Sequence, residues 1–246
     1  MRKGTHYLMD RDYEIIDFVH RYKVATDDML AEKFFGLERR NANVLRVTRK
    51  LVERNYLKRV KLCGSESYLV PTRKACRVLE ENERTPKPLT EQSLPASLAI
   101  AYYCLRNGVQ RFRGSEYARF FPLMHKPGLD GSRYYGRVQD YAFEEYDQDA
   151  TDYIDHYFDI RLGVFMVDHG GTAHRIKSKV HKFFKKREDL EVFMDLVYED
   201  QVEITVLTGL EGQQRIVERN IRDFDCHGVK IQSALIPELG DLLTMK

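Results

Sequence analysis

The stretch RLGVFMVDHGGTAHRIKSKVHKFF, residues 161–184, combines an apolar run, a glycine turn and a basic segment. The apolar run 162–167 predicts a buried strand, because short apolar runs bounded by turn residues are typical of such strands. The strand delivers Asp168 to its end, and the chain then turns over Gly170 and Gly171. The segment after the turn predicts a lysine-rich helix. An acid at a strand end that faces lysines suits metal-assisted chemistry on a phosphodiester.

A second acid is expected on the segment before this strand. DYIDHYFDI, residues 152–160, has the aromatic content of a strand and carries Asp152 and Asp155. Carboxylates on neighbouring strands repel each other unless a cation lies between them. The expected cation is Mg²⁺ or Mn²⁺, because hard ions take oxygen ligands. The cations of the predicted helix would neutralise a nucleic-acid backbone or a transition state: Arg175, Lys177, Lys179, Lys182, Lys185, Lys186 and Arg187.

The rest of this half alternates helices and strands. A helix is expected over 93–107 with a stop at Gly108, and a strand, a helix and a strand are expected over 200–209, 211–224 and 228–239. The order is helix, strand hairpin, helix, strand, helix, strand. This order predicts an α/β (α+β) fold with a central mixed sheet.

The N-terminal part predicts three helices, a hairpin and a further helix. The helices are expected over 10–22, between Thr26 and Gly36, and over about 40–54. Two alternating runs around residues 64–67 predict the hairpin, and the last helix begins near Pro71 and Thr72. This order is typical of a winged helix-turn-helix, whose third helix enters the major groove of DNA.

The charge of this part supports a polyanionic partner. Residues 1–90 hold 20 Lys and Arg against 13 Asp and Glu, whereas residues 91–246 hold 20 against 25. The predicted contacts to base edges are Asn41, Asn43 and Arg46, and the predicted contacts to phosphates are Arg39, Lys58, Arg59 and Lys61. Arg40, Arg49 and Lys50 complete the predicted interface with double-stranded DNA. A solvated helix face and a protein-binding winged helix are the alternatives.

Three segments are therefore expected: a DNA-binding domain over 1–83, a linker over 84–95 and an α/β domain over 96–246. The linker is rich in proline and polar residues. Four scattered cysteines, the lack of a secretion signal and the lack of an apolar run of membrane-spanning length predict a reduced, cytoplasmic protein without a membrane partner.

The pattern RDYEIIDFVHRYKVATDDMLAEKFF…LVERNYLKRV…SYLVPTRKACRVL, together with FMVDHGGTAHRIKSKVHKFF and VEITVLTG…RIVERNIRD…VKIQSALI, resembles the replication-relaxation proteins of plasmids and conjugative elements. The resemblance implies a winged helix followed by a degenerate PD-(D/E)XK restriction-endonuclease-like domain. Some members of that family are relaxases, which nick a transfer origin without the histidine cluster of ordinary relaxases.

The resemblance also implies roles for single residues. Asp168 matches the second metal-binding acid, Asp152 or Asp155 the first, Lys179 the helix lysine and Glu116 a possible helix acid. Met166 stands where many relatives have a glutamate, no Pro-Asp dipeptide precedes the hairpin, and Gly170 is added to the turn. The expected function is metal-dependent nicking of a plasmid transfer origin. The alternative, which Met166 favours, is a non-catalytic accessory or regulator that assembles with other replication or mobilisation proteins.

Overall fold

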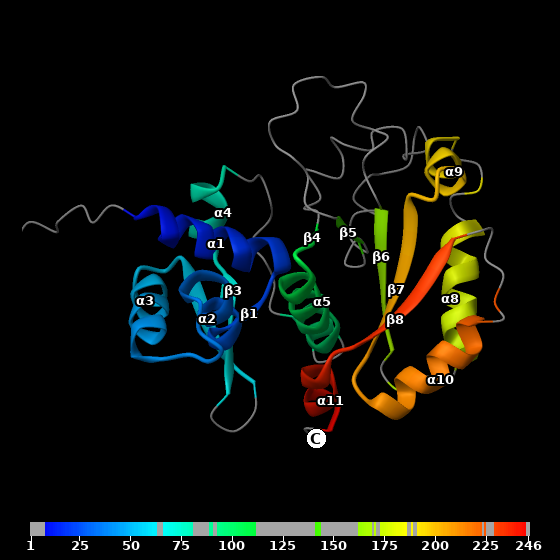
Figure 1. Ribbon diagram of the computed structural model, residues 1–246. Helices are drawn as coiled ribbons and strands as arrows, with labels where there is room; N and C mark the ends of the chain where they lie inside the picture. Colours follow the sequence, from blue (N-terminus) through cyan, green and yellow to red (C-terminus); the bar gives the residue numbers. More distant parts are fainter. Residues whose placement is uncertain are drawn as a thin grey trace, which may run out of the picture. The chain divides into compact units, whose positions relative to one another are not determined.

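The computed structural model describes residues 8–62, 66–80, 89–90, 93–111, 141–143, 162–168, 170, 173–185, 188, 191–222, 224 and 229–244, with 141–143 described by their backbone alone. The chain divides into two compact units, Met1–Ala101 (unit 1) and Tyr102–Lys246 (unit 2), and the division falls inside helix α5 (Ser93–Asn107). Of the expected linker over 84–95, residues 93–95 are already helical. Both units mix helices with strands (Figure 1).

Unit 1 has the element order expected from the sequence. It contains α1 (Asp10–Tyr22), β1 (Ala25–Thr26), α2 (Asp27–Phe35), α3 (Ala42–Glu53), β2 (Leu57–Lys61), β3 (Ser67–Pro71) and α4 (Arg73–Val78). The three strands form an antiparallel sheet in the order β1-β3-β2. The helices and the hairpin lie where the sequence predicted them. The two-residue strand β1 was not predicted.

Local side-chain chemistry sets the helix ends in unit 1. Thr26 accepts a hydrogen bond from the backbone N–H of Met29 at the start of α2, and Thr72 accepts one from Ala75 at the start of α4. Gly36 ends α2 in the left-handed conformation, with φ of 62°. The apolar stripes of α1, α2 and α3 pack against the sheet in a core that includes fully buried Ile15, Ile16, Leu30, Leu51 and Leu69.

Unit 2 contains a five-stranded sheet. After α5 come β4 (Gln110–Arg111), β5 (Tyr141–Phe143), β6 (Leu162–Val167), α8 (Ala173–Lys185), α9 (Glu191–Tyr198), β7 (Val202–Thr208), α10 (Glu211–Arg222), β8 (Lys230–Leu235) and α11 (Pro237–Thr244). The strand order is β4-β5-β6-β7-β8, antiparallel from β4 to β6 and parallel from β6 to β8. The mixed sheet agrees with the sequence analysis, whereas β4, β5, α9 and α11 were not predicted. The antiparallel partner of β6 is β5, and not the segment 152–160 that the sequence analysis expected beside it.

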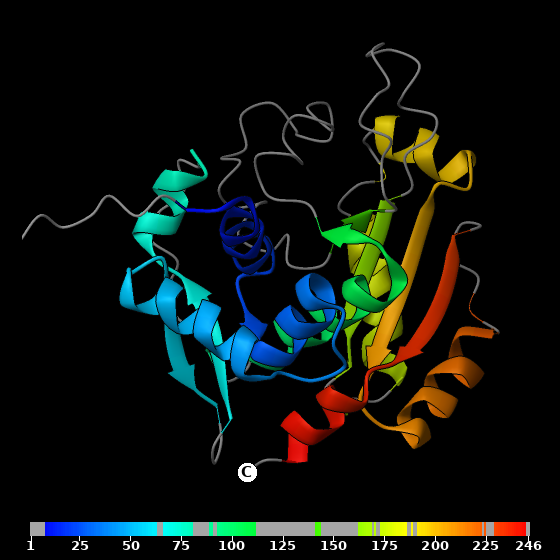
Figure 2. The same ribbon diagram turned by 60° about the vertical axis from the view of Figure 1, so that its left-hand side comes forward.

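Helices lie on both faces of this sheet (Figures 1 and 2). Alternate residues of β6 and β7 pack with α8, α9 and α10 in one apolar cluster, to which Met166, Val180, Phe193, Val206 and Val217 belong. On the opposite face, the ring of Tyr103 from α5 packs on Phe165 of β6, with 5.1 Å between the ring centres. No described helix is long and apolar enough to cross a membrane.

Candidate nucleic-acid interface and strand-end acid

Arg59 does not belong to the exposed surface that the sequence predicted for it. Its guanidinium donates two hydrogen bonds to the carboxylate of Asp27, one of them 3.0 Å long, and Asp27 is only 1% exposed. It also donates to Thr48 of α3 and Ser67 of β3, both at 2.9 Å. Arg59 therefore joins α2, α3 and the hairpin, a structural role that the sequence analysis did not foresee for a predicted phosphate contact.

Lys50 and Arg40 also have partners inside unit 1. The ammonium of Lys50 donates at 2.7 Å to Asp12, a buried residue in the first turn of α1. Arg40 forms a two-point ion pair with Glu66 at 3.1 and 2.9 Å, and this hydrogen-bonded pair raises the pKa of the guanidinium. These two cations hold the α2–α3 segment to its neighbours, so their charge is largely neutralised before any ligand arrives.

Asn41 is the N-cap of α3. Its side-chain oxygen accepts hydrogen bonds from the backbone N–H groups of Asn43 and Val44, at 3.0 and 3.2 Å. The sequence analysis assigned Asn41 to a base edge, but capping occupies this oxygen because a helix leaves its first N–H groups without partners. Asn41 thus positions the start of α3.

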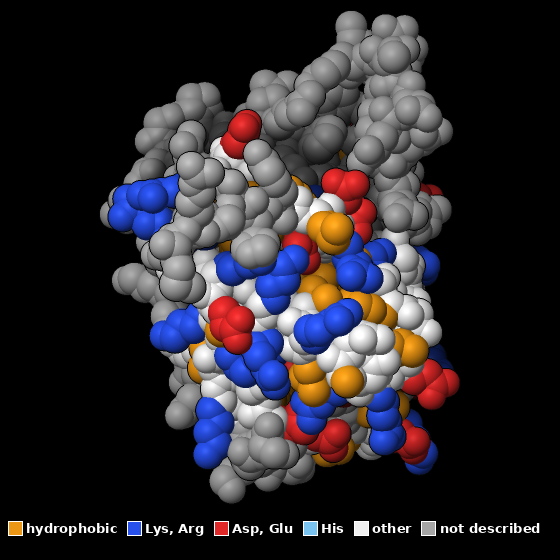
Figure 3. Space-filling model, turned by 90° about the vertical axis from the view of Figure 1, so that its left-hand side faces the viewer, with side chains coloured by type: hydrophobic (Ala, Val, Ile, Leu, Met, Phe, Trp, Pro, Cys, Tyr) orange, Lys and Arg blue, Asp and Glu red, His pale blue; other side chains and the backbone are white. Residues whose placement is uncertain are grey.

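Six predicted contacts remain exposed and have no side-chain hydrogen bond or ion pair among the described residues: Arg39, Asn43, Arg46, Arg49, Lys58 and Lys61. Arg46 and Arg49 are three residues apart and therefore lie on one face of α3, opposite the buried Val47 and Leu51. Figure 3 views unit 1 from the side that carries α3 and shows Lys and Arg side chains spread over this face. The arrangement presents cations and one amide to a polyanion.

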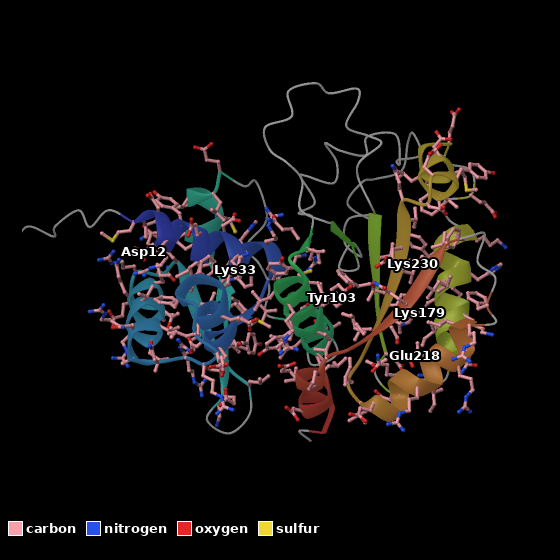
Figure 4. The ribbon with its side chains drawn as sticks, in the orientation of Figure 1. Asp12, Lys33, Tyr103, Lys179, Glu218 and Lys230 are labelled. Atoms are coloured by element: carbon pink, nitrogen blue, oxygen red, sulfur yellow. The ribbon has the colours of Figure 1, made fainter. Side chains whose placement is uncertain are left out.

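In unit 2, Asp168 follows β6 directly and is only 6% exposed. Its backbone N–H donates to the carbonyl of Leu207 at 2.8 Å, which extends the parallel pairing of β6 with β7 by one residue. The ammonium of Lys179 donates at 3.4 Å to the carbonyl of Val167, the residue before Asp168 (Figure 4). The structure thus brings the predicted acid-bearing strand end and the predicted helix lysine together.

The other predicted members of this site are not described. Asp152, Asp155 and Glu116 lie outside the described residues, as do Lys186 and Arg187. Among the residues that the structure describes, no three His, Cys, Asp or Glu side chains gather in a group that could hold a metal ion. A site for Mg²⁺ or Mn²⁺ would therefore need Asp168 together with an acid from the undescribed segments.

Two polar features of unit 2 were missed by the sequence analysis. The side-chain nitrogen of Gln213, in the first turn of α10, lies 3.3 Å from the position that a Cβ on Gly170 would take. The side-chain oxygen of Gln213 is buried and has no hydrogen-bond partner among the described residues. Gly170 has φ of 88°, so the turn after Asp168 depends on glycine. Nothing in the sequence shows that Gln213 lies beside this turn, because the two are 43 residues apart.

The second missed feature is a polar network on the face of the sheet that α5 covers. The amide of Gln232 donates to Glu203, to Thr205 at 3.2 Å and to Tyr103 at 3.4 Å, and Lys230 donates to Glu203 at 2.9 Å. Burial raises the pKa of the Tyr103 phenol. The polar residues at alternate positions 203 and 205 of β7 could have indicated a polar face of the sheet. Their hydrogen-bond partners come from other elements, so the sequence did not reveal the network.

No protein-family model, curated protein or solved structure matches the chain.

Proposed function

We propose that this protein binds double-stranded DNA with α3 and the β2–β3 hairpin of unit 1, which acts as a winged helix-turn-helix. The observation that carries the proposal is the exposed face of α3, where Asn43, Arg46 and Arg49 have no partner among the described side chains. Lys58 and Lys61 add two exposed cations on β2 of the hairpin. Asn43 and Arg46 suit base edges, and Arg49 and the two lysines suit phosphates.

The elements around α3 support this use. Three helices, a hairpin and a fourth helix occur in the order in which winged helices use them, and α3 has 12 residues, or about 18 Å of helix, which fits within a major groove. Because Arg59, Lys50 and Arg40 are held by Asp27, Asp12 and Glu66, the cations that remain for DNA are fewer than the sequence alone indicated.

Binding is tested with duplexes selected by the purified protein from a random pool, followed by fluorescence anisotropy over a salt series. Arg46→Ala should weaken binding by about 1–3 kcal/mol, roughly 5- to 150-fold, and Arg49→Ala should lower the salt slope by about one. Arg77→Ala is the matched control, because Arg77 is an exposed arginine on α4. Selection of no duplex, or equal losses in Arg46→Ala and Arg77→Ala, would sink the proposal.

For unit 2 we propose a PD-(D/E)XK-like fold that nicks the bound DNA at a plasmid transfer origin in the cytoplasm. Two features support this proposal. In the mixed sheet, the antiparallel strands β4, β5 and β6 are followed by the helix α8 and the parallel strand β7. At the end of β6, Asp168 and Lys179 lie close together. Asp168 with Asp152 or Asp155 would hold Mg²⁺ or Mn²⁺. Such an ion polarises a phosphate and activates water, and Lys179 would offset the charge that develops on the phosphate.

Nicking is tested on a supercoiled plasmid that carries a selected duplex, with Mg²⁺, with Mn²⁺ and with a chelator. The expected result is a metal-dependent open-circle product that is lost in Asp168→Asn. Asp195→Asn, which removes an exposed carboxylate from α9, is the control and should nick normally. Circular dichroism and retained DNA binding show that Asp168→Asn is folded. No metal-dependent product, or a product undiminished in Asp168→Asn, argues against nicking.

A second candidate function is that of a non-catalytic DNA-binding accessory in plasmid replication or mobilisation. Met166 favours it: this residue occupies the position at which the resemblance implies an acid, and it packs in the apolar cluster with Val164 and Val206. DNA binding that is lost in Arg46→Ala, without nicking under any metal condition, would support the accessory role and its assembly with other replication or mobilisation proteins.

A further inference from the structure

The exposed side of α8 carries four cations. Arg175, Lys179, Lys182 and Lys185 are all exposed and follow one another at intervals of three or four residues, so they form one stripe along the helix, called the basic stripe below. The opposite face, with Ile176, Val180 and Phe184, is buried in the core of unit 2. No acidic residue occurs anywhere in α8.

The basic stripe is electrostatically unfavourable in the protein alone. Cations at spacings of three and four residues repel each other, at a cost of about 0.2–0.5 kcal/mol for each pair. Arg175 lies in the first turn, near the positive end of the helix dipole, where a cation is unfavourable, although Lys182 and Lys185 in the last turn are favourably placed. Arg175, Lys182 and Lys185 have no hydrogen-bond or ion-pair partner among the described residues.

The neighbouring helix α10 shows the contrast. It too exposes three arginines, Arg215, Arg219 and Arg222, but it also carries two acids. Glu211 pairs with Arg215 at 3.2 Å, and Glu218 is four residues before Arg222. The two helices pack on the same core, but among the described residues only the arginines of α10 have acids beside them.

We propose that the basic stripe is a second nucleic-acid contact, which holds the sugar-phosphate backbone of the same DNA without reading its sequence. This inference rests on the proposed function for the identity of the partner, and it goes beyond that function by assigning a DNA contact to the other unit. For these cations, the sequence left open whether they neutralise a nucleic-acid backbone or a transition state. Successive cations of the stripe are about 4.5–6 Å apart along the helix axis, a spacing that allows each to meet a separate phosphate. No Asn or Gln lies on α8, so the stripe lacks the amides that read adenine.

A contact in each unit makes binding bivalent. The second contact forms within the complex that the first has made, so its loss weakens binding only where the DNA is long enough to reach both surfaces. If the basic stripe binds DNA, its loss weakens binding of long duplexes only. If it is a solvated helix face, its loss changes the affinity for neither short nor long duplexes.

The test uses the full chain and a triple variant, Arg175→Gln with Lys182→Gln and Lys185→Gln. Lys179 is left unchanged because it donates to Val167. Anisotropy is measured on a duplex of about 15 base pairs that carries only the selected site and on one of about 40 base pairs with flanking DNA. On the long duplex we expect at least about tenfold weaker binding and a salt slope lower by about 2.7, for three lost phosphate contacts. On the short duplex we expect no change.

The matched control is Arg215→Gln with Arg219→Gln and Arg222→Gln, which removes the same charge from α10. It should weaken binding of the long duplex less than about threefold, since Glu211 and Glu218 already offset those arginines. The proposal that the basic stripe binds DNA would be overturned by unchanged binding of the long duplex in the α8 variant, or by an equal loss of affinity in both triple variants. Failure of the proposed function gives a different result. In that case Arg46→Ala binds the short duplex as tightly as the unchanged protein does.

Discussion

At the scale of single residues, the interior of unit 1 depends on an ion pair between segments distant in the sequence. Arg59 lies on β2 and Asp27 at the start of α2, 32 residues earlier, and the carboxylate is almost fully buried. A buried carboxylate is tolerated when a cation and further hydrogen bonds satisfy it. Thr48 and Ser67 hold the guanidinium in place from two other elements. Loss of the cation would leave the charge of Asp27 buried and unpaired.

Arg59→Met should therefore destabilise unit 1 by about 3 kcal/mol, because a methionine fills similar volume but leaves the carboxylate without its partner. The measurement is urea denaturation followed by circular dichroism. Lys58→Met, a change at the exposed neighbour on the same strand, is the control and should alter stability by no more than about 0.5 kcal/mol. Similar losses of stability in both variants would mean that the ion pair between Arg59 and Asp27 does not contribute to the stability of unit 1.

Tyr103 provides a pH-dependent term in unit 2. Burial raises the pKa of its phenol above the ordinary value of 10.0, so the neutral form is favoured more strongly in the folded protein than in the unfolded chain. The resulting stability is fully present below pH 10 and is lost as the pH rises through the folded pKa. Tyr103→Phe should flatten the fall in Tm that sets in above about pH 10. An equally steep fall in the variant would contradict this assignment.

Residue-level prediction succeeded where the cause is local. Thr26 and Gly36 were assigned to the two ends of α2, because a cap acts within a few residues. The pair between Arg59 and Asp27 was not foreseen, since Asp27 looked like an ordinary first-turn acid. Sequence spacing alone cannot show which cations of a basic segment meet buried carboxylates, and tertiary folding decides this.

At the scale of elements, α11 approaches the end of β7 more closely than side chains allow. A Cβ on Gly209 would lie 2.5 Å from the backbone nitrogen of Gly240, and a Cβ on Gly240 would clash with the carbonyl of Gly209. The atoms that a Cβ would meet belong to the backbone, so they cannot move aside by a change of rotamer. Two glycines therefore permit the contact between the loop after β7 and the C-terminal helix.

Gly209→Ala should destabilise unit 2 by about 1–3 kcal/mol, the usual cost of overpacking. Gly212→Ala, three residues later in α10, has open space around its Cβ and should be neutral or stabilising by up to about 1 kcal/mol. Thermal denaturation of the two variants measures the difference. Equal stability in both would show that α11 can move away from β7 without cost.

Length and periodicity explain which elements could be predicted. The helices α1, α3 and α10 have 12 or 13 residues with a clear apolar stripe, and their positions were predicted within two residues. The missed elements are short: β1 and β4 have two residues each, β5 has three, and α9 and α11 have eight each. Elements this short are formed by packing against the sheet and leave little periodic signal.

At the scale of the whole molecule, the described part of each unit has its own apolar core. Unit 1 packs α1, α2 and α3 on its sheet, and unit 2 packs α8, α9 and α10 on β6 and β7. The sequence indicated two parts through the change of charge sign near residue 90, but it placed a linker over 84–95, where the structure begins α5 at Ser93. The net charge of a segment indicates which partners it can bind, whereas the packing of the core determines where a structural unit ends.

Two separate cores predict two unfolding events in calorimetry of the full chain. Arg59→Met should lower the transition of unit 1 and leave that of unit 2 in place, and Gly209→Ala should do the reverse, since each change acts on contacts within one unit. Addition of the selected short duplex should raise only the transition that Arg59→Met lowers, because a ligand stabilises the unit that binds it. If both variants and the duplex shift a single transition, the two cores unfold as one cooperative unit and α5, which crosses the division, is the element that couples them.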